Sequence, residues 1–397
     1  MKALMTGLLV AASCVACDNN PAAPNIEPQL DAIADSITVN LFTSASVGVV
    51  NHNTVDAVLY VSRDGNVATV NSLGAVTGLA TGSTYIVAAL SSQPTVRDSV
   101  RVRVYSDSCG GARPDFGGTV TADDRKLFSY DANAPLNLQK TVVSTTNGVE
   151  RSGISYTSPD GGSVTGFMWD PVTRSSLRPG IVIMHGHPAN ANAMSGMAQI
   201  YAQYGAVVIA IDAPFARRPG GAMTLFPLDS AEQIQVIKDL QRAVDVLRSH
   251  PNVDANRIGY IGASWGGATG ALFVGIERRL KAAALVVGHP GQVSHATGPG
   301  GFKNILGLPC ARRVAWIRAM APVEPIRFVR DANVPLLLQN GTIDEFIPEY
   351  EAAELHVAAP QPKTILWYTA GHGLNQQAVF DRHDWLVEKI GIDPRQQ

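Results

Sequence analysis

The chain has 397 residues and a formal net charge of −2; 46% of its residues are hydrophobic and 16% are charged. This length suits two domains, and the apolar content excludes global disorder because a sizeable core can be buried. The near-neutral charge gives no electrostatic basis for binding nucleic acid. We therefore expect a small molecule or a neutral polymer as the partner.

The N-terminal segment has the features of a secretory signal. Lys2 precedes an apolar run that is too short to span a membrane, and small residues follow. Cys14 and Cys17 both follow small residues, as in bacterial lipoprotein signals. We favour Cys17 as the lipidated residue; Cys14 is the second choice, and cleavage with full secretion is the third. The interpretation is a signal peptide at 1–17 and a tether at 18–27, so that a lipid alone anchors an exported protein in the bacterial cell envelope, in the periplasm or on the outer surface.

Two cysteines remain once the signal is removed, Cys109 and Cys310. In an oxidising compartment they could form a disulfide that ties the inter-domain segment to the C-terminal domain. The sequence does not show whether their Cβ atoms meet, so two unpaired thiols are the alternative.

Residues 28–106 have the pattern of a small all-β domain. The segment is poor in charge and rich in Val, Thr and Ser, and it shows period-two alternation broken by glycine, which favours a β-sandwich. It resembles the group 2 bacterial immunoglobulin-like domain, with Tyr60 where that family often has Trp. The resemblance implies a spacer or adhesion module without catalytic residues. The matching residues are Val67 to Val70, Gly74, Val76 to Gly78, Gly82 and the closing "VRVRV".

A Gly-, Asp- and Pro-rich linker at 107–140 leads into a second domain at 141–397. There, apolar strands alternate with helices, which predicts an α/β fold with a mainly parallel sheet covered on both faces. In such sheets the active site lies at the carboxyl ends of the strands. The expected strands are 180–187, 206–212, 257–262, 282–288, 334–341 and 363–370.

Two expected helices carry end signals. An amphipathic helix at 229–250 has Asp229 or Ser230 as its N-cap. The last helix is expected to end at Gly391, the residue type that most often closes a helix.

The sequence Gly262-Ala263-Ser264-Trp265-Gly266 lies between an expected strand and an expected helix. A serine nucleophile at this position has to occupy a sharp, strained turn, and small neighbours allow strand and helix to pack closely. This context favours Ser264 as a catalytic nucleophile over a serine in a glycine-rich helix start that only packs.

A serine nucleophile needs a base, and the base needs a carboxylate that orients it. In the α/β-hydrolase order the acid and then the histidine follow the serine. Asp344 comes just after the strand at 334–341, with Glu345 as the second choice, and His372 comes just after the next strand, between two glycines. We predict that Ser264, Asp344 and His372 form the catalytic triad.

Acyl transfer also needs donors for the oxyanion. The backbone N–H groups of Trp265 and His187 are the candidates, because one follows the nucleophile and the other lies in the loop after an expected strand. His185 and His187 have a spacing that metal ligands can use, but no third ligand stands near them in the sequence, so we expect no metal.

The second domain, from about 150 to 390, resembles α/β-hydrolases of the dienelactone hydrolase and prolyl-oligopeptidase-like group. The motifs that carry this resemblance are "HGHP", "GASWGG", "VPLLLQNGTIDEFIP" and "AGHG". The resemblance implies the same triad. The chain departs from the lipase-like branch because it has His-Gly-His-Pro in place of His-Gly-Gly-Gly. This difference affects the assignment of the oxyanion donor in this loop.

Two loop-rich segments, 213–229 and 289–325, follow strand ends and are expected to form the rim of a pocket, with a small lid as a further option. Arg217 and Arg218 in the first segment form either a solvated pair or a site for an acidic substrate group. His289 and His295, in the second segment, are further pocket-lining candidates.

These features together favour an exported serine hydrolase that cleaves small-molecule or polymer-linked carboxylic esters without a cofactor. A serine peptidase of the prolyl-oligopeptidase-like group is the first alternative, although the N-terminal region is too short for the β-propeller that such peptidases commonly carry. The second alternative is a surface binding protein with an inert hydrolase-like domain. The intact set of Ser264, Asp344 and His372 argues against it.

Overall fold

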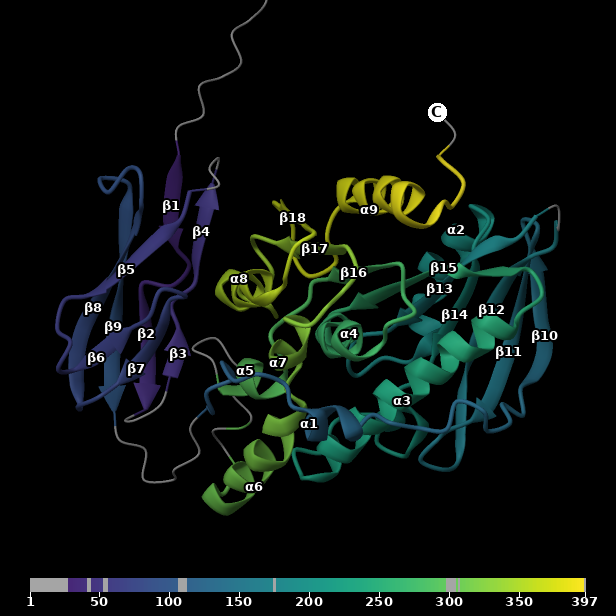
Figure 1. Cartoon of the computed structure of the whole chain (residues 1–397), viewed down its shortest axis with the longest axis horizontal. Coiled ribbons are helices and arrows are strands. Elements are labelled where there is room, and N and C mark those ends of the chain that lie inside the picture. Colours follow the sequence, from purple (N-terminus) through teal and green to yellow (C-terminus); the bar gives the residue numbers. More distant parts are fainter. Residues whose placement is uncertain are drawn as a thin grey trace, which may run out of the picture.

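The structure is a computed structural model that describes residues 28–40, 44–52, 56–105, 113–173, 176–297, 305 and 308–395 (Figure 1). The expected signal peptide and tether, with Cys14 and Cys17, lie outside the described residues, as does Cys109. Within the described ranges, no helix has the length and apolar character needed to cross a membrane.

The N-terminal part is the predicted β-sandwich. One sheet has the strand order β2-β9-β8-β5 and the other β3-β7-β6, while β1 pairs with β4. Along β9, Val100, Val102 and Val104 are buried and the arginines between them are exposed, as the alternation predicts. The strands are β1 (Gln29–Ala32), β2 (Ser36–Asn40), β3 (Ser44–Ser46), β4 (Val49–His52), β5 (Val58–Ser62), β6 (Ala68–Val70), β7 (Ala75–Gly78), β8 (Gly82–Leu90) and β9 (Arg97–Tyr105).

The C-terminal part is built on one large sheet with the order β10-β11-β12-β14-β13-β15-β16-β17-β18. The strands from β14 to β18 in this order are parallel, and the β10, β11 and β12 end of the sheet is antiparallel. The predicted α/β class is therefore confirmed. The strands are β10 (Gln139–Thr146), β11 (Val149–Thr157), β12 (Ser163–Pro171), β13 (Arg178–Met184), β14 (Val207–Ile211), β15 (Val253–Ala263), β16 (Ala282–Val286), β17 (Leu336–Gly341) and β18 (Lys363–Tyr368).

Helices cover both faces of this sheet (Figure 1). Successive strand residues enter different cores: Val182 packs with residues of α3, α4 and α7, whereas Ile183 packs with residues of α2 and α9. The helices are α1 (Ala122–Lys126), α2 (Ser195–Gln203), α3 (Leu228–Ser249), α4 (Trp265–Ile276), α5 (Gln292–Thr297), α6 (Cys310–Met320), α7 (Pro325–Val329), α8 (Glu349–Ala358) and α9 (Gln376–Ile390), and the short 3-10 helices are η1 (Ala191–Met194), η2 (Pro214–Arg217) and η3 (Ala321–Val323).

The two helix-end predictions have different outcomes. Gly391 closes α9 in the left-handed conformation, as predicted, with φ 69°. The N-cap prediction for α3 is wrong, because the helix begins one residue before Asp229 and its N-cap is Pro227. The Asp229 carboxylate instead accepts backbone N–H groups of the preceding loop and the indole N–H of Trp316.

The segment between the two domains packs on the catalytic part. Phe116 and Phe128 belong to its core, and Arg113 forms an ion pair with Glu354 of α8. The sandwich approaches the same helix, since a Cβ placed on Gly48 would lie 2.3 Å from the Cβ of Tyr350. Helix α8 thus lies between the sandwich and the large sheet (Figure 1).

Of the two cysteines that could form a disulfide, Cys310 lies within the described residues and Cys109 does not. Cys310, the first residue of α6, is disulfide-bonded, so a free thiol at this position is excluded. The chain has four cysteines and Cys310 alone lies within the described residues, so its partner lies outside them.

Candidate active site

Ser264 occupies the sharp turn that the sequence predicts between β15 and α4. Its φ of 57° and ψ of −118° place a non-glycine residue in a strained region of backbone space. Both flanking glycines are required by close contact, since a Cβ on Gly262 would lie 2.1 Å from the carbonyl oxygen of Gly266. A Cβ on Gly266 would lie 2.4 Å from the carbonyl oxygen of Met184. The tight packing of strand, turn and helix therefore holds Ser264 in its strained conformation.

The loop after β13 passes directly beside Ser264. Strands β13 and β15 are parallel neighbours, with Met184 paired to Gly262, so both chains leave the sheet at the same edge. A Cβ on Gly186 would lie 3.1 Å from the Cβ of Ser264 and 3.6 Å from its Oγ. The absence of a side chain at Gly186 thus lets the backbone of this loop approach the serine.

Asp344 and His372 meet at the same edge of the sheet, after the parallel neighbours β17 and β18. The Nδ1–H of His372 donates to the Asp344 carboxylate, with its two oxygens at 3.0 and 2.9 Å. The Asp344 side chain is fully buried, and the His372 side chain is 24% exposed. The imidazole is therefore oriented from one nitrogen by a carboxylate.

The ionisation of Asp344 is favoured by its hydrogen bonds. Burial opposes the charge, but the bonds from His372 and from the backbone N–H groups of Ile347 and Phe346 outweigh it and hold the Asp344 pKa below its ordinary value. Glu345, the second choice for the acid, accepts the backbone N–H of His372 at 3.3 Å rather than its ring N–H.

The backbone N–H of His187 is one of the predicted oxyanion donors, and its ring connects two loops. Its Nε2 accepts the backbone N–H of Met223 at 2.9 Å, and its ring packs against Phe215. Burial lowers the His187 pKa, which suits this acceptor role. The third residue of "HGHP" thus ties the loop after β13 to the segment 213–229. Trp265, the other predicted donor, is the first residue of α4, where backbone N–H groups have no partner within the helix.

His185 uses both of its ring nitrogens within the protein. Its Nδ1 donates to the carbonyl of Gly186 at 2.7 Å, and its Nε2 accepts the backbone N–H of Ala213 at 3.1 Å. The rings of both histidines of "HGHP" therefore connect the loop after β13 to the segment 213–229 by hydrogen bonds.

Arg217 and Arg218 are neither a solvated pair nor a pair directed at substrate. Arg217 binds the buried Asp239 at 2.6 Å, and Arg218 binds Glu232 through two nitrogens, at 2.6 and 3.2 Å. Both expectations for this pair are wrong, because α3 supplies two carboxylates that hold the rim segment against the catalytic domain.

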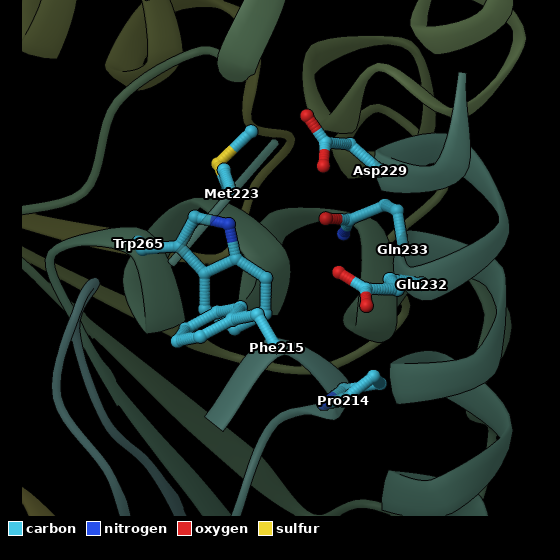
Figure 2. A pocket seen from close by; sticks show the side chains of 7 residues that line it. All are labelled: Pro214, Phe215, Met223, Asp229, Glu232, Gln233 and Trp265. Carbon is cyan, nitrogen blue, oxygen red and sulfur yellow. The ribbon is translucent and has the colours of Figure 1, made fainter. Parts of the chain in front are cut away.

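A cavity of about 10 Å³ lies between Trp265 and α3 (Figure 2). Phe215 meets the Trp265 ring edge-on, with 5.0 Å between the ring centroids, and forms an aromatic wall with it. Asp229 and Glu232 face this space from α3, but both accept hydrogen bonds from neighbouring residues. The cavity is close to the lower limit for one water molecule, so it is too small to hold a substrate.

His289 and His295, predicted only as pocket-lining residues, pack against each other with 4.8 Å between ring centroids. His295 also binds Glu351 of α8, a residue that the sequence analysis did not single out. No local pattern signals this contact, because Glu351 lies 56 residues further along the chain in an ordinary helical stretch.

The fold and the elbow at Ser264, with the Asp344–His372 pair on the same edge of the sheet, define a hydrolase of the α/β-hydrolase class. A model of the dienelactone hydrolase family matches residues 165–382, more than half of the chain. The chain therefore belongs to the dienelactone hydrolase family, and the predicted resemblance is confirmed.

Solved structures with the same fold include two acetyl xylan esterases. The enzyme from Paenibacillus sp. R4 is 20% identical, with a TM-score of 0.54, over 70% of this chain and 97% of that one. Acetyl xylan esterase 1 from Thermoanaerobacterium sp. JW/SL YS485 is 14% identical, with a TM-score of 0.55, over 68% of this chain and 94% of that one. A comparison with curated proteins gave no match.

Proposed function

We propose that this protein is an exported serine esterase that hydrolyses carboxylic esters with Ser264, His372 and Asp344. The observation that carries the proposal is the Asp344–His372 hydrogen bond, which follows β17 and β18 on the sheet edge where the strained Ser264 follows β15. Membership in the dienelactone hydrolase family supports ester hydrolysis as the reaction.

In the proposed reaction the Oγ of Ser264 attacks the carbonyl carbon of the ester while Nε2 of His372 takes its proton. Asp344 keeps the Nδ1–H of His372 directed toward itself, so that Nε2 is the basic nitrogen, and it stabilises the imidazolium that forms. The tetrahedral intermediate then collapses, and His372 returns the proton to the departing alcohol. Water, deprotonated by His372, releases the acid and restores Ser264.

The oxyanion is assigned to the backbone N–H groups of Trp265 and His187. The helix N-terminus favours negative charge near Trp265. The hydrogen bond from the Met223 N–H to the His187 ring supports His187 as the second donor, because it fixes the loop that passes Ser264. Pre-oriented donors are worth more than flexible ones, since they need no reorganisation during the reaction.

Apolar side chains flank the acid–base pair and suit an uncharged acyl or alcohol group. Phe346 and Ile343 are 59% and 66% exposed on the loop that carries Asp344, and the Phe346 ring lies edge-on to His372 at 5.1 Å. The paired state of Arg217 and Arg218 removes one source of affinity for acidic substrates. Acetyl esters, including those on polysaccharides, are the first substrates to test.

The signal segment with Cys17, or alternatively Cys14, supports export and lipid anchoring in the cell envelope. The β-sandwich would then separate the catalytic domain from the anchor. Mass spectrometry of the mature N-terminus tests this part: a diacylglyceryl group on either cysteine supports the anchor, and a cleaved, unmodified N-terminus rejects it.

Hydrolysis of p-nitrophenyl esters from acetate to decanoate tests the reaction. Ser264→Ala should lower kcat by roughly 10⁴-fold or more. The matched control is Ser249→Ala, at the C-terminal end of α3, whose hydroxyl binds only the carbonyl of Val246 among the described contacts. The control should keep wild-type turnover.

Two outcomes would redirect the proposal. Turnover of aminoacyl or prolyl amides without turnover of esters would favour the peptidase. Turnover of neither class by the folded wild-type protein would favour a binding protein with an inert hydrolase-like domain.

A further inference from the structure

Three side chains of metal-ligand type converge beside the Asp344–His372 pair. His289 follows β16, His295 lies on α5, and Glu351 lies on α8. One ligand atom of each lies within 4.8 Å of one ligand atom of the others. His289 and Glu351 are only 3% and 1% exposed. Three groups from two distant segments are thus buried around one point.

The ring of His289 is prepared to act as a ligand. Its Nδ1 lies 3.2 Å from the carbonyl oxygen of Gly291, and since a carbonyl only accepts, Nδ1 carries the proton and Nε2 carries the lone pair. Burial and the neighbouring His295 lower the His289 pKa, which keeps the ring neutral. A backbone carbonyl on the second ring nitrogen is the usual support of a histidine that binds metal.

Glu351 is positioned in a comparable way. The hydroxyl of Tyr350 donates to its Oε1 at 3.0 Å, and its Oε2 lies 2.7 Å from Nδ1 of His295. Its carboxylate is therefore fixed with one oxygen toward the His295 imidazole. The 2.7 Å contact means that one hydrogen atom lies between Nδ1 of His295 and Oε2 of Glu351.

Carboxyl groups from several elements lie around the three side chains. Glu324, Glu351 and Glu354 all lie close enough to Arg113 to raise the pKa of its guanidinium, so three carboxyl groups surround one fixed cation. Glu324 and Asp344 also act on His295 in the same direction.

We propose that His289, His295 and Glu351 bind one divalent transition-metal ion of the zinc type. Two imidazoles and one carboxylate form a ligand set that Zn²⁺ uses, whereas Mg²⁺ and Ca²⁺ prefer sites made of oxygen alone. The ion takes the place of the proton shared by His295 and Glu351, and that proton leaves to solvent. Binding thus exchanges one M²⁺ for one H⁺.

The ion would tie α5 to α8, and α8 follows the loop that carries Asp344. The same helix also contacts the β-sandwich through Tyr350. The proposed ion would link these elements, and the proposal stands independently of the proposed esterase reaction.

Titration calorimetry with Zn²⁺ on the full chain, after EDTA treatment and removal of the chelator, tests the proposal. We expect one equivalent to bind, with release of a proton, and Mg²⁺ to give no binding. His289→Gln and Glu351→Gln should each weaken binding by on the order of 100-fold or more, since loss of a second-shell partner already costs 10- to 100-fold. The matched control is His383→Gln, a buried histidine of α9 bonded to the Asp393 carbonyl, which should bind as the wild type does.

Thermal melting separates lost binding from lost folding. Zn²⁺ should raise the Tm of the wild type and of His383→Gln, and leave that of His289→Gln unchanged. His289→Gln keeps the His295–Glu351 pair, so it decides the question even if Glu351→Gln fails to fold. Absence of saturable Zn²⁺ binding by the wild type, or undiminished binding by folded His289→Gln, overturns the proposal and leaves a buried His–Glu ion pair.

Discussion

Asp344 presents both carboxylate oxygens to Nδ1 of His372, at 3.0 and 2.9 Å, although the two residues are 28 positions apart in the chain. The contact arises because β17 and β18 are parallel neighbours that end at the same edge of the sheet. One hydrogen bond therefore sets both the tautomer and the orientation of the imidazole.

Asp344→Asn should lower kcat on p-nitrophenyl acetate by roughly 10⁴-fold, because an amide no longer holds the basic nitrogen of His372 toward the substrate. The matched variant is Glu345→Gln, which removes a carboxylate that accepts the backbone N–H of His372. It should change kcat by less than about tenfold. A larger loss for Glu345→Gln than for Asp344→Asn would assign the acid to Glu345.

Gly266→Ala should destabilise the fold by about 2–4 kcal/mol, because its Cβ would lie 2.4 Å from a backbone carbonyl oxygen of the neighbouring strand. The matched control is Gly196→Ala in α2, where an added Cβ meets nothing within 4 Å. That variant should gain about 0.5–1 kcal/mol from helix propensity. Urea unfolding followed by circular dichroism measures both; equal stability of the two variants would contradict the packing at the elbow.

The raised pKa of Glu324 predicts that the stability of the fold depends on pH. Burial raises its pKa to about 7, even though it accepts backbone N–H groups of Val293 and Ser294 and lies near the charge of Arg113. A folded-state pKa above the unfolded value means that the folded state binds more protons, so stability falls as the pH rises from about 4.5 to about 7. The slope from this one group is at most about 1.4 kcal/mol per pH unit.

Glu324→Gln should remove this slope, since the amide does not titrate. Urea unfolding at pH 5, 6 and 7, in EDTA, compares the variant with the wild type. The wild type should lose stability relative to Glu324→Gln as the pH rises. A constant difference across these three values would show that Glu324 is ionised throughout.

Phe346→Ala should raise KM for p-nitrophenyl butyrate more than for the acetate, because the lost ring lies beside His372 and is 59% exposed. The expected change in the ratio of kcat/KM values is about 3- to 10-fold, equal to roughly 1 kcal/mol of apolar contact. Phe226→Ala, on the far rim segment beside Arg312, is the comparison. An unchanged chain-length preference in Phe346→Ala would place the acyl group elsewhere.

The fold class and the positions of Ser264, Asp344 and His372 could be predicted because they depend on local patterns. Strand–helix alternation gives the parallel sheet, and the order of residues after successive strands gives the edge at which they lie. The structure brings Asp344 and His372 into contact and places Ser264 in the strained turn. Their catalytic roles remain predictions.

The remaining features depend on contacts between distant segments. The partners of Arg217 and Arg218 lie on α3, that of His295 lies on α8, and Asp229 binds a loop instead of capping its helix. Each of these side chains could pair with several groups, and the packing of the folded chain decides which group it meets. Periodicity predicts which face of a helix is buried, but it does not predict which charge meets which.

Labelling with a fluorophosphonate asks whether Ser264 is the nucleophile, because such reagents react with activated serines. We expect one adduct per chain, located by peptide mapping at Ser264, with loss of ester turnover in proportion to labelling and no adduct in Ser264→Ala. Esterase activity that persists in Ser264→Ala, or an adduct at another serine that abolishes turnover, would contradict it.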